Sequence, residues 1–190
     1  LIASIKQLSS YENIEEVVDV EQVLRYFIVH NYVVNGDSYT GSMIHNYYLY
    51  EEDGKMSMIP WDYNLAFGTF QGNNASSAVN DDIDEVLSDR PMQAWIFSQD
   101  AYSQMYYALY QDMLKSVNIQ EIIEDAYTLI DSYVEKDPTV FCTYEEFQKG
   151  VVALKEFCSL RSESVKLQLN GSTELVDASD LNLSDMGTMS

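Results

Sequence analysis

Residues 44–60 read IHNYYLYEEDGKMSMIP, a pattern that predicts the β-hairpin of this chain. The first strand, expected over 44–50, is rich in aromatic and branched side chains. The acidic turn at 51–54 ends in Asp-Gly, a dipeptide typical of tight hairpins. The second strand, expected over 55–59, stops at Pro60 because proline has no backbone N–H to donate to a ladder.

Helical patterns flank this hairpin on both sides. Asp19 and Gln22 have the spacing of an N-terminal cap, and apolar residues then recur at helical intervals to about Val34. The tripeptide Asn-Gly-Asp at 35–37 ends that helix, since glycine suits a positive φ. Past the hairpin, apolar periodicity predicts helices at 92–97, 101–117, 119–135 and 143–168. One hairpin followed by a helical bundle is an α+β fold that is mostly α.

A long irregular stretch, residues 61–89, separates the hairpin from the later helices. Loops of this length inside a compact domain are usually functional or mobile. The stretch contains the acidic run DDIDE at 81–85, for which a solvated loop and a Ca²⁺-binding loop are the alternatives. The run lacks the alternating oxygen ligands and central glycine of an EF-hand, which favours the solvated loop.

By size, the 190 residues form one domain or at most two. Residues 1–169 carry the patterned elements and are assigned to the folded domain, whereas 170–190 are acidic and polar and predict a tail or linker. No signal peptide is visible at the start of the chain. Because the chain begins with leucine and not with an initiator methionine, we expect it to be a piece of a longer protein. Cys142 and Cys158 would lie about 24 Å apart on one helix, which predicts free thiols.

The charge balance excludes several classes of partner. Ten basic and 31 acidic side chains give a net charge of −21. Such a field repels nucleic-acid phosphates and anionic lipid heads, so we expect neither nucleic-acid binding nor membrane-surface binding. No run of about 18 uncharged apolar residues is present, so no segment is expected to insert in a membrane. A nucleotide would bind only with divalent cations held between its phosphates and the protein.

Three polar residues flank the hairpin: Asp37 precedes it, Asn46 begins its first strand and Asp62 follows its second strand. Because a hairpin brings its outer ends together, we expect Asn46 and Asp62 to lie within reach of each other. Their oxygens are hard ligands that suit Mg²⁺. Asp37 would accept a hydroxyl proton or orient a nucleophile. Protein-kinase-like phosphotransferases use this set of groups, and ordinary turn and capping residues are the alternative.

Two motifs carry a resemblance to a known family. HNYYLY at 45–50, followed by IPWDYNLAFG at 59–68, resembles the signature of the CotH kinase family (spore coat protein H). The segment 20–39, which ends in NGDSY, is similar to the helix and loop that precede this signature. The likeness continues more loosely from 90 to about 168, so it covers most of the chain.

The resemblance implies an atypical protein-kinase-like fold that phosphorylates serines of spore coat proteins with ATP and Mg²⁺ or Mn²⁺. It assigns Asp37 to the catalytic-loop aspartate, Asn46 to a metal ligand, and Asp62 to the catalytic metal-binding aspartate of the Pro-Trp-Asp motif. His45 and Asn64 would support cofactor binding, as would Trp61. Relatives often have aspartate where this chain has Asn64, which removes one anionic ligand from the site.

The resemblance further implies that residues 1–169 are the C-terminal lobe of such a kinase. Kinase-like folds also need a strand lysine that pairs with the nucleotide phosphates, and only Lys6 precedes the signature here. We therefore expect the longer protein to be the enzyme, with a protein serine and a nucleotide as partners, in the spore coat or at the cell surface. The alternative is a catalytically inactive kinase-like module that serves coat or surface assembly.

Overall fold

The computed structural model describes residues 1–70 and 74–187. These residues are mostly helical and contain one two-stranded antiparallel sheet, which confirms the expected α+β, mostly α class. In chain order, the elements are α1 (Ile2–Leu8), α2 (Val20–Tyr32), β1 (Tyr47–Glu52), β2 (Lys55–Pro60), α3 (Ala75–Val79), α4 (Pro91–Ala94), α5 (Asp100–Ser116), α6 (Ile119–Val134) and α7 (Tyr144–Leu169). Short 3-10 helices occupy Ile14–Glu16, Trp95–Phe97 and Leu183–Met186.

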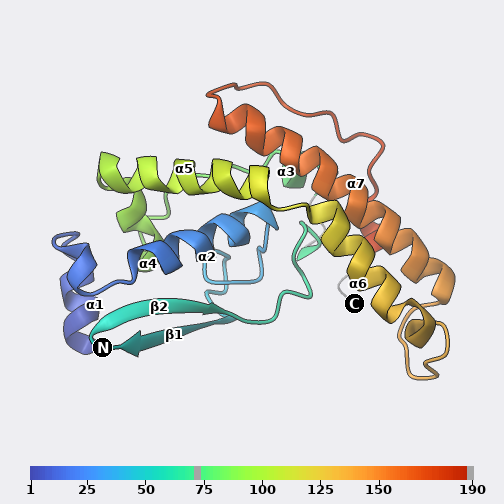
Figure 1. Ribbon diagram of the computed structural model, residues 1–190, viewed down its shortest axis with the longest axis horizontal. Coiled ribbons are helices and arrows are strands. Elements are labelled where there is room, and N and C mark those ends of the chain that lie inside the picture. Colours follow the sequence, from blue (N-terminus) through green and yellow to red (C-terminus); the bar gives the residue numbers. More distant parts are fainter. Residues whose placement is uncertain (71–73, 188–190) are drawn as a thin grey trace.

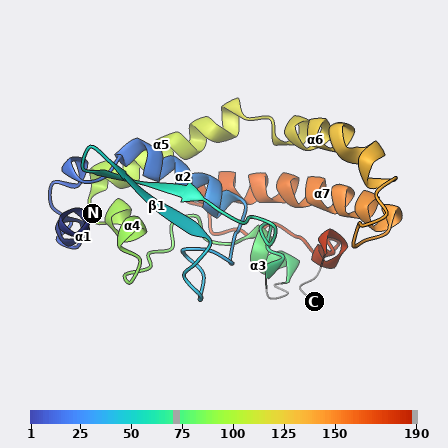
Figure 2. The ribbon, with the colours of Figure 1, turned by 90° about the horizontal axis from the view of Figure 1, so that it is seen from below.

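Helix α2 is the centre of the architecture. It lies between the hairpin and α5, and α7 packs near the C-terminal ends of α2 and α5 (Figure 1). Seen from below, α6 and α7 run side by side away from the hairpin (Figure 2). The open end of the hairpin and the C-terminal end of α2 both point to the middle of the molecule (Figure 1). The loops that leave these ends therefore meet there.

The hairpin has the expected turn but a later start. Its register pairs Tyr47 with Pro60 and Glu52 with Lys55, which leaves a two-residue Asp-Gly turn. Both turn residues have positive φ (50° and 83°), as a tight hairpin requires. The strand expected from residue 44 begins only at Tyr47, because Ile44 and Asn46 have positive φ (51° and 55°) that an extended strand excludes.

Hydrogen bonds fix the outer edge of β2 to α2. The Met56 N–H donates to the Val17 carbonyl (2.8 Å), and the Asp19 N–H donates to the Met56 carbonyl (2.9 Å). At Met58, two residues further along β2, the side-chain amide of Gln22 forms the corresponding hydrogen bonds. Its Nε2 donates to the Met58 carbonyl (2.5 Å), and its Oε1 accepts from the Met58 N–H (3.0 Å). One side chain thus replaces a neighbouring strand.

Substitution of Gln22 by leucine should loosen the hairpin. The Gln22→Leu variant leaves both polar groups of Met58 without their partner, at a cost of about 1–3 kcal/mol in the free energy of unfolding. Urea denaturation measures this loss. Gln111, an exposed residue of α5, provides the matched control. The unfolding free energy of Gln111→Leu should stay within about 0.5 kcal/mol of that of the unsubstituted protein. Equal stabilities of the two variants would contradict the bridging role of Gln22.

The core forms around two sets of buried side chains. The larger set joins α2, the inner face of the hairpin and α5, through residues such as Phe27, Met58 and Tyr106. Three tyrosines of α5, Tyr102, Tyr106 and Tyr110, are therefore core residues. The second set lies along α7 and contains Phe157 and Cys158. Neither cysteine forms a disulfide, as expected, and burial raises the pKa of the Cys158 thiol to about 12.

The segment after α7 does more than the expected polar tail or linker. It folds back along α7 (Figure 1) and adds apolar side chains to the second set, namely Val176, Ala178, Leu181 and Leu183. These residues alternate with acidic and polar ones, so one side of the segment is buried while the other keeps its charges in water. Short helix α3, inside the stretch expected to be irregular, also packs on α7.

Arg161 of α7 ties three elements together from inside the protein. Its side chain is fully buried and donates to the carbonyls of Tyr32 (3.3 Å) and Asn31 (2.8 Å) at the C-terminal end of α2. It also donates to the carbonyls of Val79 (3.1 Å) and Asp81 (2.6 Å) after α3. Because the last carbonyls of a helix have no partner within it, this guanidinium supplies part of the cap of α2.

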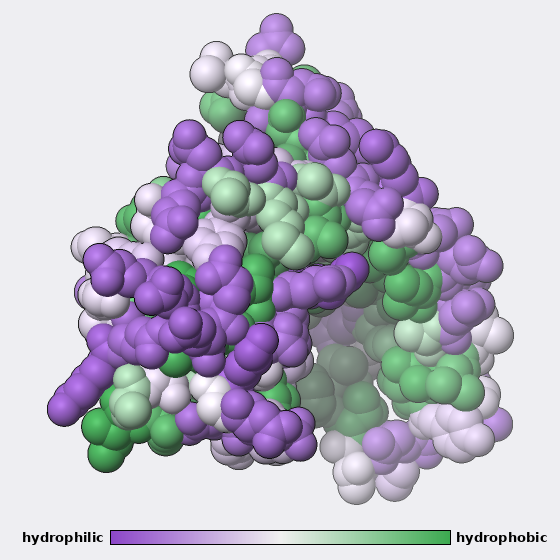
Figure 3. All heavy atoms as spheres, turned by 60° about the vertical axis from the view of Figure 1, so that its left-hand side comes forward, coloured by the Kyte–Doolittle hydropathy of each residue, from purple (hydrophilic) through white to green (hydrophobic). Residues whose placement is uncertain are grey.

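The surface is strongly polar. Hydrophilic side chains cover most of the face seen in Figure 3, and apolar side chains gather around a hollow in it. Among the described helices, none combines the length and the hydrophobicity that crossing a bilayer demands.

Candidate functional site

Two loops meet at the C-terminal end of α2. The first leaves α2 and carries residues 33–46, and the second leaves β2 and carries 61–68. Backbone hydrogen bonds join them, because the Phe67 N–H donates to the Val33 carbonyl (2.5 Å) and the Gly68 N–H donates to the Val34 carbonyl (3.2 Å). The segment that follows Asp62 is therefore attached to the residues from which the Asp37 loop begins.

Asp37, His45 and Asn46 form one cluster. The Asn46 Nδ2 donates to the backbone carbonyl of Asp37 (2.9 Å) and to its Oδ2 (3.0 Å). His45 Nε2 lies 2.7 Å from Asp37 Oδ1, a contact that becomes an ion pair when the imidazole is protonated. The geometry of this contact is not that of a hydrogen bond, so Oδ1 is a buried acceptor without a donor in the described part of the chain. Asp37 is only 7% exposed, and His45 lies against one of its carboxylate oxygens.

Asn46 and Asp62 leave the same end of the hairpin. The last register pair is Tyr47 with Pro60, so Asn46 lies one residue and Asp62 two residues beyond it. The Asp62 side chain is exposed, and within residues 1–70 and 74–187 it accepts no hydrogen bond. Asn64 is exposed as well. The register thus places both expected metal ligands just beyond the open end of the hairpin and leaves the Asp62 carboxylate accessible.

The backbone around this cluster is strained. Five non-glycine residues near the two loops have positive φ: Val34 (47°), Ile44 (51°), Asn46 (55°), Asp62 (55°) and Phe67 (61°). Such a conformation costs about 1–3 kcal/mol for β-branched residues such as Val34 and Ile44, whereas asparagine and aspartate tolerate it better. Strain of this kind collects at functional sites, where the surrounding structure holds side chains in positions that a relaxed loop would not give.

Arg90 holds the Asp37 loop by hydrogen bonds to its backbone, a role that the sequence did not reveal. Its Nε donates to the Tyr39 carbonyl (2.7 Å) and its Nη2 to the Gly41 carbonyl (2.9 Å). The Met92 N–H donates to the Tyr39 hydroxyl (3.1 Å). The segment 90–92, Arg-Pro-Met, lies in the part of the chain where the family resemblance is looser. Its hydrogen bonds attach it directly to the loop between Asp37 and Asn46.

Gly41 is a sensitive point of this loop. A Cβ there would lie 1.9 Å from the Gly36 carbonyl oxygen, so Gly41→Ala must displace the backbone on one side of Asp37. We expect the free energy of unfolding to fall by about 1–3 kcal/mol, the usual cost of overpacking. Thermal denaturation beside Ser42→Ala, an exposed neighbour, measures the difference. Similar melting temperatures for both variants would show that the loop relaxes freely.

The acidic residues at 81–85 lie apart from the hairpin residues in sequence and were the other candidate for a metal site. In the described ranges, no three His, Cys, Asp or Glu side chains gather as a metal site would require, so the acidic run at 81–85 does not form a Ca²⁺ cage. Asp81, Asp82 and Glu85 instead line a cavity of about 150 Å³ beside the Asp37 loop. Desolvation by burial raises the pKa of the Asp81 carboxyl to about 6. Mg²⁺ needs no such cage, because one or two protein ligands plus phosphates and water commonly suffice.

Comparison with known proteins shows the family to which the chain belongs. Residues 1–165 match the family model described as CotH kinase protein. The chain therefore belongs to the CotH family, as the hairpin motifs indicated.

A particular relative is the inner spore coat protein H of Bacillus subtilis (strain 168). The two are 26% identical over 159 residues, which are 80% of this chain and 42% of that protein. The chain thus spans less than half the length of this curated relative. No solved structure matches the chain.

Proposed function

We propose that this chain is the metal-binding C-terminal lobe of an ATP-dependent serine kinase of the CotH type, located in the spore coat. The observation that carries this proposal is the pairing of Asn46 with Asp37 at the hairpin end from which Asp62 also leaves. Family membership and the relative named as an inner spore coat protein support the kinase class and the location.

Asn46 and Asp62 would hold Mg²⁺ or Mn²⁺. Both amide hydrogens of Asn46 are directed to Asp37, which fixes the amide and leaves its carbonyl oxygen as the free ligand. The exposed carboxylate of Asp62 adds the negative charge. A hard cation prefers this donor chemistry, and the bound ion supplies charge neutralisation to the phosphates of ATP. Because residue 64 is asparagine and not aspartate, Asp62 is the one anionic ligand of this proposed site. We therefore propose that the site holds a single divalent metal ion.

Asp37 would orient the acceptor serine. Its Oδ2 is held by Asn46, and its Oδ1 is the acceptor that lacks a donor. A serine hydroxyl can donate to Oδ1 only after His45 moves away, because His45 lies over this oxygen. The His45 side chain is 40% exposed, so it is free to turn toward solvent. His45 thereby covers the carboxylate until an acceptor arrives.

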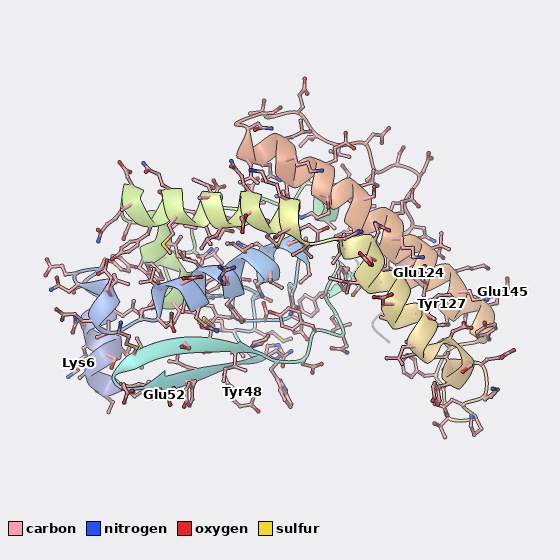
Figure 4. All side chains as sticks on the ribbon, viewed as in Figure 1. Lys6, Tyr48, Glu52, Glu124, Tyr127 and Glu145 are labelled. Atoms are coloured by element: carbon pink, nitrogen blue, oxygen red, sulfur yellow. The ribbon has the colours of Figure 1, made fainter. Side chains whose placement is uncertain are left out.

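The outer face of the hairpin would receive the nucleotide base. Tyr48 and Trp61 are exposed and meet edge to face, with ring centroids 5.4 Å apart. Figure 4 shows Tyr48 on the side of the hairpin away from α2. Lys6 lies on α1, at the turn end of the hairpin and away from the candidate site (Figure 4). We therefore assign the phosphate-pairing lysine to a part of the protein outside this chain.

Tryptophan fluorescence tests nucleotide binding. Trp61 is exposed beside the site and Trp95 is fully buried, so a ligand on the hairpin should alter the emission of Trp61 alone. Addition of Mg²⁺ and a non-hydrolysable ATP analogue should give a saturable change that EDTA reverses and that Asp62→Asn and Trp61→Phe abolish. A change that survives EDTA would contradict metal-dependent binding.

An inactive kinase-like module is the second candidate. The burial of Asp37 beneath His45 and the neutral Asn64 favour it. It predicts metal-dependent nucleotide binding, or none, without phosphate transfer by the complete protein. Transfer of the γ-phosphate of ATP to serine-containing peptides decides between the two candidates.

A further inference from the structure

His30 occupies a buried position between the two loops of the site. It lies on α2, is 1% exposed and stacks on Tyr26 with ring centroids 5.6 Å apart. Burial lowers the pKa of its imidazole to about 4, so the ring is neutral near pH 7. Three polar neighbours satisfy the ring nitrogens in the protein interior.

Those neighbours belong to both loops. On one side, His30 Nε2 lies 2.6 Å from the Thr40 hydroxyl and 3.0 Å from the Ser38 hydroxyl. On the other side, Nδ1 lies 3.3 Å from the Tyr63 hydroxyl. Ser38 follows Asp37 directly, and Tyr63 follows Asp62 directly. One rigid ring therefore joins the residues next to both candidate aspartates.

The proton positions follow from Ser38. Its hydroxyl donates to the Asn35 carbonyl at 2.6 Å, so it has no hydrogen left for His30 and must accept from it. We accordingly assign the ring proton to Nε2, which donates to Ser38 and Thr40. Nδ1 is then the acceptor for the Tyr63 hydroxyl. Every polar atom of the ring is used in this arrangement, and each bond points to one of the two loops.

We propose that His30 is a positioning residue that sets the placement of Asp37 relative to Asp62. The proposal rests on the function proposed above, because it matters for phosphate transfer only if these aspartates serve the acceptor and the metal. Any buried histidine needs hydrogen-bond partners, but these could all belong to one element. His30 instead forms the direct polar connection between the two loops, in addition to the backbone bonds at Val33 and Val34.

The first experiment tests this connection without any ligand. Tyr63→Phe removes the hydroxyl at one end, and backbone amide NMR shifts of Ser38 and Thr40 report on the other end. We expect these shifts to change when Tyr63→Phe is made in the unsubstituted protein. The same change should vanish in a His30→Leu background. If Tyr63→Phe shifts these amides equally in both backgrounds, the coupling does not run through His30 and the proposal is overturned.

The second experiment tests the consequence in the complete protein. His30→Leu should lower kcat for phosphate transfer by about 10- to 100-fold, the effect of a small misplacement, with the KM for ATP nearly unchanged. His30→Gln keeps a donor and an acceptor and should recover part of the loss. Val23→Ala, seven residues before His30 on the same buried face of α2, controls for destabilisation and should keep kcat.

The outcomes separate the two proposals. If Tyr63→Phe shifts the Ser38 and Thr40 amides through His30, but His30→Leu leaves kcat unchanged, the positioning role is overturned. Equal losses of kcat in His30→Leu and Val23→Ala would assign the effect to stability and overturn it as well. If the unsubstituted complete protein neither binds Mg²⁺ with nucleotide nor transfers phosphate, the proposed function fails, whereas the NMR experiment still decides whether His30 joins the loops.

Discussion

Asp62→Ala in the complete protein is expected to lower the transfer of the ATP γ-phosphate to serine by at least about 10²–10³-fold, the usual cost of removing one major electrostatic contact from a transition state. Asp62 is the exposed carboxylate at the hairpin end, and with Asn64 beside it no neighbouring acid replaces its charge. The side chain accepts no hydrogen bond in the described ranges, so its loss should leave the fold unchanged. Radiolabel incorporation from γ-labelled ATP measures the effect.

Asp125→Ala is the matched control for this experiment. Asp125 is an exposed aspartate of α6, remote in sequence from the hairpin, and its removal changes the net charge equally. We expect phosphate transfer within about twofold of the unsubstituted protein for this variant, since surface charges act weakly at a distance in salt. Unchanged transfer in Asp62→Ala, or an equal loss in both variants, would reject Asp62 as the metal-binding residue.

Arg161→Met should cost about 3–5 kcal/mol of unfolding free energy. The substitution keeps an apolar stem but leaves the carbonyls of Asn31, Tyr32, Val79 and Asp81 without this donor in the protein interior. Each buried unsatisfied group costs about 1–3 kcal/mol, and a total above about 4 is exceptional for one substitution. Because Arg161 holds the end of α2, the Asp37 loop should lose protection in amide hydrogen exchange as well.

Arg25→Met is the control for Arg161. Arg25 pairs with Glu21 on the exposed side of α2, a contact one turn apart that contributes little in water. Its loss should change the unfolding free energy by no more than about 0.5 kcal/mol. Guanidinium denaturation of both variants gives the comparison. A difference below about 1 kcal/mol would mean that water or a relaxed backbone satisfies the carbonyls around Arg161.

Local sequence signals predicted the hairpin and the long helices, because short-range chemistry decides them. The Asp-Gly pair set the turn, and Thr143 with Glu146 formed the capping box that starts α7. The beginning of β1 was wrong by three residues. Left-handed conformations at Ile44 and Asn46 displaced it. Asparagine adopts this conformation more readily than most residues, but isoleucine disfavours it, and the loop is held in place by its contacts with Asp37 and Arg90.

The support of the site lay beyond sequence reasoning. Asp37, Asn46 and Asp62 stood out because they flank the hairpin, and the structure joins the first two by hydrogen bonds. The burial of Asp37 under His45 gave no signal in the sequence. Neither did the contacts of Arg90 and Arg161, because their partners are distant along the chain and are backbone carbonyls, which every residue type has.

Paramagnetic broadening by Mn²⁺ tests most directly whether the hairpin end holds a divalent ion. In the ¹⁵N-labelled chain with a non-hydrolysable ATP analogue, substoichiometric Mn²⁺ should broaden the amide signals of 46–47 and 61–63 first, and Asp62→Asn should prevent this. Broadening centred on the acidic residues 81–85 or 180–185, with the hairpin signals sharp, would contradict a metal site formed by Asn46 and Asp62.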